Sequence, residues 1–164
     1  MGHRGRGGSV GTAATVALSK AQISYAVRAY EQNPAAESFG LEAAQALGVD
    51  PARVFKTLLV ETGTGLAVAV VPVDHTLDLK AMASALSVKK VAMADPAAAE
   101  RSSGYVVGGI SPIGQKRPLP TVVDASAFDH DTMLVSGGRR GLDIELSPAD
   151  LVVLTRARQA PIAR

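Results

Sequence analysis

Lys56 is the most unusual charged residue of the sequence, because it interrupts Val54-Phe-Lys-Thr-Leu-Leu-Val60, a run otherwise typical of a strand. Alternation along a strand places Lys56 on the same face as Leu58 and Val60, which makes that face apolar. A lysine in this setting either points to solvent or lies in a pocket where its ammonium group meets an anion. The pattern favours neither interpretation over the other.

The segment from Gly104 to Asp124 is the first candidate for an active-site loop. Apolar, β-prone residues stand at its two ends, and its middle contains Gly108, Gly109, Pro112, Gly114, Pro118 and Pro120. Glycine permits close backbone approach and unusual φ, whereas proline fixes φ and stiffens the chain. We therefore expect a rigid loop that adds little to the hydrophobic core and presents backbone N–H groups to a ligand.

A second distinctive segment runs from Val135 to Leu146, with the sequence Val-Ser-Gly-Gly-Arg-Arg-Gly-Leu-Asp-Ile-Glu-Leu. Its glycines predict a tight turn that displays Arg139 and Arg140, two cations suited to a phosphate or a carboxylate. After the turn, Asp143 and Glu145 share one strand face. They are either an acid/base pair or a solvated face opposite the core, and their spacing favours the solvated face.

Familiar nucleotide and serine-hydrolase motifs are incomplete. The run Gly109–Lys116 lacks P-loop spacing, because Gln115 separates glycine from lysine and Arg117 stands where Ser or Thr is needed. Ser111 and Ser136 do not lie in a Gly-x-Ser-x-Gly turn, so a serine nucleophile is not favoured.

Metal and thiol chemistry is also not indicated. The sequence has no cysteine, and therefore no disulfide, zinc–thiolate site or cysteine nucleophile. His3, His75 and His130 lie far apart in the sequence, so we expect no metal site.

Length and composition predict one domain with a full core, since the chain has 164 residues of which 47% are hydrophobic. We expect residues 1–12 to form a flexible, basic, glycine-rich tail and residues 13–164 a single domain. No apolar run reaches the roughly 18–20 residues that span a bilayer, and the missing cysteines fit a reducing cytosol, so we expect a cytoplasmic protein.

The net charge is +2. Three cation pairs are either ordinary solvated surface or contacts for nucleic-acid phosphates: Lys89-Lys90, Lys116-Arg117 and Arg139-Arg140.

Periodicity and capping signals predict an α+β fold. Helices are expected near residues 12–22, 41–47, 79–86, 96–101 and 148–158, and strands near 23–30, 55–62, 66–73, 105–107, 121–124, 132–136 and 142–146. Hairpins and short strands outnumber strand–helix–strand crossovers. We therefore expect a curled, mostly antiparallel or mixed, barrel-like sheet with flanking helices.

The sequence resembles the YbaK family, free-standing proteins similar to the editing domain inserted in bacterial prolyl-tRNA synthetases. The resemblance runs from about Ala13 to the C-terminus and is carried by the following motifs: Phe55-Lys-Thr-Leu-Leu59, Leu77-Asp-Leu-Lys80, Met93-Ala-Asp95, Gly104-Tyr-Val-Val-Gly-Gly-Ile-Ser-Pro-Ile-Gly-Gln-Lys116, Leu119-Pro-Thr121 and Ser136-Gly-Gly…Arg140-Gly-Leu-Asp-Ile-Glu-Leu146. It departs from the family pattern at Pro118, where another basic residue is more usual.

The resemblance implies trans-editing: cleavage of the ester in mischarged Cys-tRNA(Pro), with no metal, no cofactor and no protein nucleophile. The substrate's own thiol would attack its ester carbonyl. Lys56 matches the family's essential lysine, expected to hold the tRNA 3′ end or polarise the substrate, and Gly108 matches a loop glycine whose amides face the ester like an oxyanion hole. Substrate-pocket positions match Tyr30, Phe39, Thr57, Gly109, Ser136 and Asp143, the last suited to the substrate α-amino group.

The partners implied are the acceptor end of tRNA(Pro) and prolyl-tRNA synthetase, with neither DNA nor a membrane. Two alternatives stay open. One is deacylation of another small aminoacyl-tRNA such as Ala-tRNA(Pro), because a methylene or thiol in an apolar pocket is worth only about 1–3 kcal/mol. The other is a non-catalytic protein that binds tRNA or a synthetase.

Overall fold

The computed structural model describes residues 11–36 and 38–164; the expected tail over residues 1–12 lies almost wholly outside these residues. The α-helices are α1 (Ala13–Lys20), α2 (Phe39–Leu47), α3 (Leu79–Leu86), α4 (Pro96–Ser103) and α5 (Pro148–Thr155), with 3₁₀ helices η2 (Pro51–Arg53) and η3 (Ala125–Asp129). The strands are β1 (Ala26–Ala29), β2 (Phe55–Glu61), β3 (Leu66–Pro72), β4 (Ala92–Met93), β5 (Thr121–Asp124), β6 (Met133–Arg139), β7 (Leu142–Leu146) and β8 (Arg158–Ala160).

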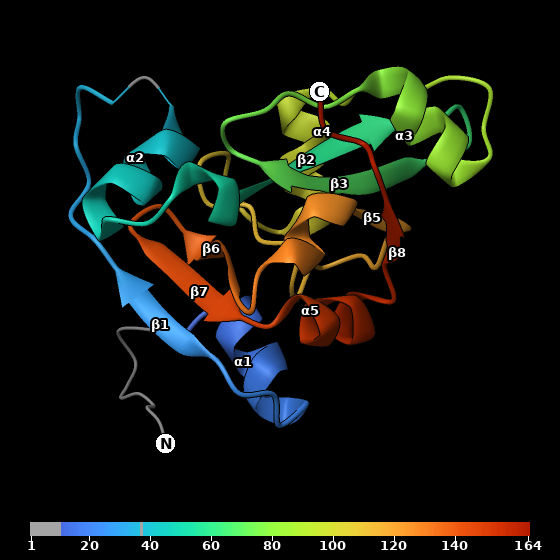
Figure 1. Cartoon of the computed structure of the whole chain (residues 1–164). Helices are drawn as coiled ribbons and strands as arrows, with labels where there is room; N and C mark the ends of the chain where they lie inside the picture. The colour runs from blue at the N-terminus through green and yellow to red at the C-terminus, as the bar shows by residue number, and fades with distance from the viewer. Residues whose placement is uncertain (1–10, 37) are drawn as a thin grey trace.

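The strands form two sheets, which together confirm the α+β class (Figure 1). One sheet is antiparallel and has the order β1-β7-β6. The other has the order β4-β2-β3-β5-β8 and is mixed, since β3 pairs with β5, and β5 with β8, in parallel. A single bridge between Val54 and Leu134 links β6 to the residue before β2. The sheet surface is therefore curled but does not close into a barrel.

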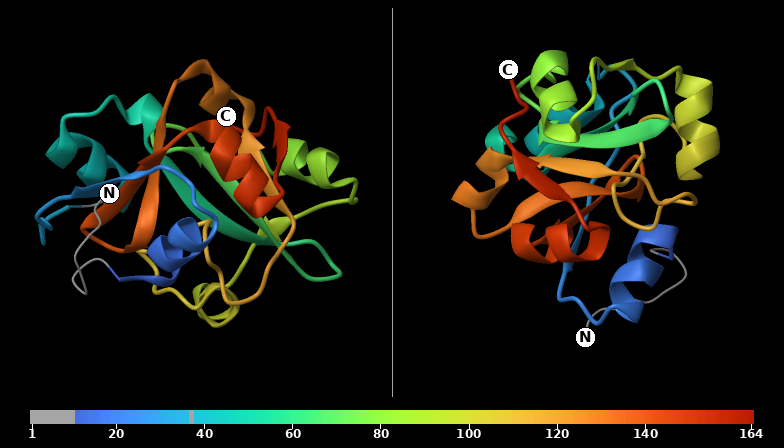
Figure 2. Two further views of the ribbon diagram at one scale, coloured as in Figure 1. Left: turned by 90° about the horizontal axis from the view of Figure 1, so that it is seen from below. Right: turned by 90° about the vertical axis from the view of Figure 1, so that its right-hand side faces the viewer.

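Helices cover both faces of the larger sheet, as the two views of Figure 2 show. On one face α3 buries Met82 against Val60, Val71 and Val122. On the other face α1 and α5 contribute Leu18 and Leu151 to the largest core, which also contains side chains of β6 and β7. A third cluster lies under α2, where Ala43 and Ala44 pack against Val54, Val73 and Leu134. This third cluster positions α2 beside the start of β2.

The helix boundaries follow from local side-chain chemistry. Asp78, Ser147 and Ser38 each accept a hydrogen bond from a backbone N–H in the first turn of the helix that follows. At the other end, Gly48 and Gly104 end α2 and α4 in the left-handed conformation that glycine adopts without strain. These capping residues lie within a few residues of each helix end, so the helix boundaries can be predicted from the sequence.

The expectations for the glycine- and proline-rich loop are partly wrong. Residues 105–107 form no strand. The loop also contributes to the core: Tyr105 is 7% and Ile113 0% exposed, and the Tyr105 hydroxyl donates to the Ile113 carbonyl at 2.6 Å. The loop is held by its own buried side chains in place of a sheet partner. The short strands β4 and β8 were not expected, since two and three residues carry no periodic pattern.

No helix in the described part of the chain combines the length and the apolar character needed to cross a bilayer.

Candidate active site

A cavity of about 310 Å³ opens between α2, the first half of β2, α4 and the loop that follows α4. This volume is at the lower end of the range for small-molecule sites. Most of the lining is apolar, and the polar groups converge from separate elements. The lining residues are Tyr30, Ser38, Phe39, Gly40, Ala43, Val54, Phe55, Lys56, Thr57, Leu58, Leu59, Met93, Ala94, Pro96, Ala99, Val107, Gly108, Ile110, Ser136 and Asp143.

Seven of the eight site residues singled out in the sequence lie around this one cavity: Lys56, Gly108, Tyr30, Phe39, Thr57, Ser136 and Asp143. The eighth, Gly109, is not among the lining residues. A Cβ atom at Gly109 would lie 2.5 Å from the Cα of Arg139, so this glycine lets the loop approach the β6–β7 turn. The structure thus shows Gly109 packed against the β6–β7 turn, and its contact with a substrate stays a prediction.

Lys56 projects from the part of β2 that pairs with β3 on one side only, because β4 pairs with β2 at Val60 and Glu61 alone. Its half-buried side chain lines the cavity, which favours the pocket interpretation over the solvated one. Desolvation lowers the pKa of the Lys56 ammonium, and the charge of Asp74 opposes this effect. Lys56 forms no ion pair with any described residue, which leaves its ammonium available to a ligand.

Thr57 and Ser136 supply hydroxyl groups. The Thr57 Oγ1 atom is buried and has no hydrogen-bond partner among the described residues. Because an unpaired buried hydroxyl costs free energy, it is a natural contact for a bound molecule. The Ser136 Oγ atom accepts from the Gly138 N–H at 3.1 Å, which fixes the hydroxyl and leaves its proton for donation.

Asp143 and Glu145 do not form a solvated face, contrary to the interpretation that their spacing favoured. Asp143 is only 5% exposed and lines the cavity. Burial raises the pKa of Asp143 to about 7, although the charge of Arg28 opposes this. Arg28 lies opposite Asp143 in the β1–β7 register but donates its hydrogen bond to Glu145, which Arg53 also binds at 2.9 Å. Asp143 is left as a buried carboxyl group whose charge depends on the pH.

The backbone at Gly108 forms the wall of the cavity that faces α2. The Gly109 N–H donates to the Val106 carbonyl at 2.8 Å, so residues 106–109 form a tight turn, and Gly108 has a φ of +97°. The Val107 N–H donates to the Glu100 side chain at 2.8 Å. Of the amides expected to face a substrate, those of Val107 and Gly109 are therefore occupied, while the Gly108 N–H has no acceptor among the described residues.

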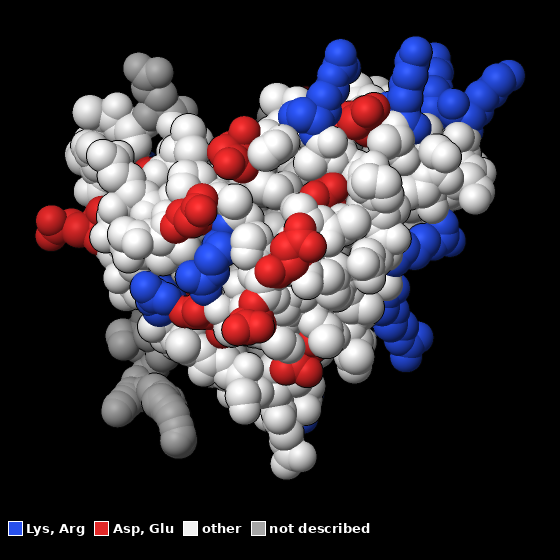
Figure 3. Space-filling model, in the orientation of Figure 1, with Lys and Arg blue, Asp and Glu red and all other residues white. Residues whose placement is uncertain are grey.

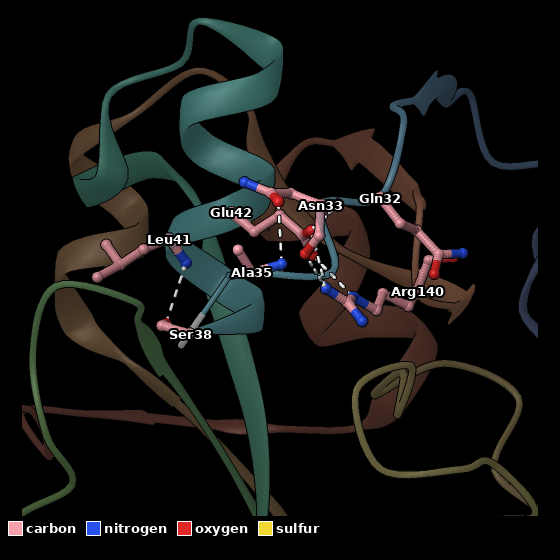
Figure 4. A network of polar contacts seen from close by, with 7 residues as sticks. All are labelled: Gln32, Asn33, Ala35, Ser38, Leu41, Glu42 and Arg140. Atoms are coloured by element: carbon pink, nitrogen blue, oxygen red, sulfur yellow. Dashed lines mark hydrogen bonds and ion pairs between the residues drawn. The ribbon is translucent and has the colours of Figure 1, made fainter.

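Arg140 binds a carboxylate of the protein itself (Figure 4). Its Nε and Nη2 groups donate to the two oxygens of the Glu42 carboxylate, at 2.8 and 2.9 Å respectively. The expectation that the turn displays Arg140 to an external anion is therefore wrong. Sequence reasoning missed Glu42, because an acid in the first turn of a helix is ordinarily a surface residue.

No three His, Cys, Asp or Glu side chains within residues 11–36 and 38–164 come together as possible metal ligands.

A model of the aminoacyl-tRNA editing domain matches residues 34–154 of the chain. The chain belongs to the aminoacyl-tRNA editing domain family. Residues 34–154, the part of the chain that matches the family, contain every residue that lines the cavity except Tyr30. The resemblance to the YbaK family is confirmed, and with it the activity at the level of aminoacyl-tRNA editing.

Relatives support the same assignment. The chain is 42% identical over 120 residues to EbsC of Enterococcus faecalis, described as a candidate Cys-tRNA(Pro)/Cys-tRNA(Cys) deacylase; the match covers 73% of each chain. Among solved structures, hypothetical protein APE2540 is 25% identical with a TM-score of 0.84, covering 93% of this chain and 100% of that one. A candidate trans-editing enzyme for prolyl-tRNA synthetase is 23% identical with a TM-score of 0.82, covering 98% and 99%. The last comparison establishes the shared editing-domain fold.

Proposed function

We propose that this editing domain clears mischarged Cys-tRNA(Pro) by cleaving the ester between cysteine and the 3′ adenosine. The observation that carries the proposal is the cavity itself. It gathers the Lys56 side chain, the Gly108 backbone, whose N–H has no acceptor among the described residues, and the buried Asp143 carboxyl group around a space of about 310 Å³. The 42% identity to a candidate Cys-tRNA deacylase supports cysteine as the amino acid.

Each polar group has a role that its position suits. The ionised Asp143 carboxylate would bind the substrate α-ammonium, and the Lys56 ammonium would bind the phosphate or ribose oxygens of the terminal adenosine. The Gly108 N–H would donate to the carbonyl oxygen as negative charge develops on it. The Thr57 hydroxyl, buried without a partner among the described residues, would bond to the aminoacyl group or its ribose. These residues bind and orient, and none is placed as a nucleophile–base pair.

The nucleophile would be the substrate thiol. Its sulfur attacks the ester carbonyl carbon, the carbon–oxygen bond to the ribose breaks, and the thiol proton passes to the leaving ribose oxygen through solvent. A four-membered cysteine thiolactone is released and then takes up water to give free cysteine. The domain contributes by holding the thiol against the carbonyl, which converts a rare encounter into a favoured geometry.

A panel of tRNA(Pro) carrying cysteine, alanine, serine or proline tests the proposal. We expect rapid release of cysteine and slow release of the other three, since serine matches cysteine in size but lacks the thiol. A preference for alanine would transfer the assignment to Ala-tRNA(Pro) editing. If no amino acid is released while tRNA still binds, the chain is a non-catalytic tRNA-binding member of the family.

We also propose that prolyl-tRNA synthetase supplies part of the tRNA selectivity as a partner. Deacylation of Cys-tRNA(Pro) and Cys-tRNA(Cys) would be compared with and without the synthetase. The partnership predicts that added synthetase accelerates the first reaction only. Equal acceleration, or none, contradicts it.

A further inference from the structure

The guanidinium group of Arg140 joins three segments at one end of the cavity. Besides its two bonds to Glu42, Arg140 donates to the Asn33 carbonyl at 2.8 Å, and the Asn33 N–H donates to Glu42 at 2.5 Å. Figure 4 shows Arg140 reaching from the β6–β7 turn toward Glu42 on α2, with Asn33 between them. The Glu42 side chain is 3% exposed and that of Arg140 26%, so the pair is largely shielded from water.

The same guanidinium group lies over the ring of Phe39, with its Cζ atom 4.7 Å from the ring centre. Phe39 begins α2, and its ring packs directly on Gly108, since a Cβ atom at Gly108 would lie 3.2 Å from the ring. The ring is therefore held between a fixed cation and the backbone of the Gly108 turn. Because Arg140 is bonded on its other edge to Glu42, the ring has a defined position even though it is 42% exposed.

The surroundings extend this order to other lining residues. The Tyr30 N–H donates to the Gly141 carbonyl at 2.9 Å, and the Gln32 amide donates to the Arg140 carbonyl at 3.2 Å. Thus the β6–β7 turn, which follows Ser136 and precedes Asp143, is tied to the segment that carries Tyr30. These bonds are made by the backbone of the turn, and they add to the Arg140–Glu42 ion pair in joining the turn to the residues before α2.

We infer that Arg140 and Glu42 are positioning residues that hold the Phe39 ring against the Gly108 turn, where both line the cavity, and thereby set which aminoacyl side chains the editing site accepts. The inference rests on the proposed deacylase function and goes beyond it, because neither residue lines the cavity. Lysine at position 140 would keep the charge but lose the bidentate geometry and the planar stacking on Phe39. The ring would then be free to move outward, and the cavity would admit a longer side chain.

The test uses two substrates that both carry a thiol, Cys-tRNA(Pro) and homocysteinyl-tRNA(Pro), which differ by one methylene. For Arg140→Lys we expect kcat for the cysteine substrate to fall at least about tenfold with KM nearly unchanged. The cysteine-to-homocysteine ratio of kcat/KM should fall about tenfold as well. Glu42→Gln should shift the ratio in the same direction, because it removes the charge that holds Arg140.

Arg53→Lys is the matched control. Arg53 has a similarly shielded side chain, 30% exposed, and bonds to Glu145 and Thr132, but it does not line the cavity or contact Phe39. Its replacement should lower the unfolding midpoint to a similar extent and leave the substrate ratio unchanged. In a Phe39→Leu background, Arg140→Lys should no longer alter the ratio, because the ring through which it acts is gone.

The outcomes distinguish the positioning role from the proposed function on which it rests. If the wild-type protein releases neither amino acid, the proposed function fails. If the wild type is active and Arg140→Lys and Glu42→Gln keep its substrate ratio, the positioning role is overturned. It is also overturned if both variants unfold under conditions where Arg53→Lys stays folded, since the pair would then serve stability alone.

Discussion

At the scale of single residues, the most informative group is the Asp143 carboxyl, because its burial links stability to function. It has little contact with water, and Arg28, its cross-strand neighbour, donates its hydrogen bond to Glu145. A carboxylate in such a place is destabilising until it meets a cation. The α-ammonium of an aminoacyl ester is a cation of suitable size. The site therefore carries a free-energy cost that substrate binding would relieve.

Asp143→Asn should stabilise the protein in a pH-dependent manner. The pKa is 3.8 in its ordinary state and about 7 in the fold. Below about pH 4 the group is protonated in both the folded and unfolded states and has no effect. Between pH 4 and 7 the unfolded chain ionises first, so the wild type loses stability relative to the variant as the pH rises. With about 1.4 kcal/mol for each pKa unit, the loss approaches about 4 kcal/mol above pH 7. Urea unfolding of both proteins at pH 4, 6 and 8 measures this loss. If the difference in the free energy of unfolding between the two proteins is the same at all three pH values, Asp143 is solvated in the folded protein.

The activity should respond in the opposite sense. We expect kcat/KM for Cys-tRNA(Pro) to rise through an apparent pKa near 7 as Asp143 ionises, and Asp143→Asn to lose both most of its activity and this rising limb. A pH–rate profile of the two proteins checks the prediction. The rate of spontaneous ester hydrolysis, measured without enzyme at each pH, is subtracted from both. If Asp143→Asn still shows the rise of kcat/KM with pH, that rise belongs to another ionisable group.

Lys56→Ala should reduce deacylation at least about 100-fold without lowering stability. Burial lowers the pKa of the Lys56 ammonium, and it has no ion-pair partner among the described residues, so removing the charge relieves a desolvation cost. Lys80→Ala, on the helix α3 that contributes no cavity residue, is the control. Turnover within a factor of two of wild type would show that Lys56 is merely a lysine at the cavity margin.

At the scale of elements, the sequence predicts what local chemistry decides. The β2–β3 hairpin follows from Gly63-Thr-Gly65 between two apolar runs, and the starts of α3 and α5 follow from Asp78 and Ser147. The burial of Asp143 does not follow, because carboxylates at alternate strand positions ordinarily face water. Residues of α2 and β2, which come from distant sequence, line the same cavity as Asp143 and enclose it. Glu42 escapes prediction for the same reason.

The close packing of α2 on Val73, the residue that follows β3, gives an element-scale prediction at Gly40. A Cβ atom there would lie 2.3 Å from the Cγ1 atom of Val73. Alanine ordinarily favours a helix over glycine by about 1 kcal/mol, but this contact would push α2 outward and displace Phe39. Gly40→Ala should therefore be destabilised and should lose kcat. Adding Val73→Ala removes the nearest atom, although the Cβ atom at 2.8 Å remains, and should restore part of both stability and kcat. If Gly40→Ala alone is as stable and active as the wild type, the contact with Val73 does not limit the position of α2. Urea unfolding measures the stability of each variant, and turnover of Cys-tRNA(Pro) measures its kcat.

At the scale of the whole molecule, the charge distribution indicates how a tRNA would approach. Figure 3 shows acidic side chains gathered over the centre of one face, with a few basic side chains among them and the other lysines and arginines at the upper and right margins. Arg101, Lys116 and Arg117 are exposed, and none forms an ion pair with a described residue. They are grouped at the end of α4, because the N–H groups of Lys116 and Arg117 donate to carbonyls of Ser103 and Ser102. The beginning of the same helix lines the cavity, so this cluster is suited to acceptor-stem phosphates.

Replacing Arg101, Lys116 and Arg117 with alanine should raise KM for Cys-tRNA(Pro) and leave kcat nearly unchanged, since phosphate contacts position the substrate without touching the ester. Each phosphate that the variant no longer binds should also lower the dependence of log KM on log salt by about 1. Lys80→Ala combined with Arg156→Ala removes two cations from the ends of helices that do not line the cavity, and should change neither quantity. The cysteinyl ester of adenosine has no stem, so all three proteins should cleave it equally. A triple variant impaired on this small ester would mean that the loop after α4 had been distorted, and an unchanged KM for tRNA would remove the cluster from the binding surface.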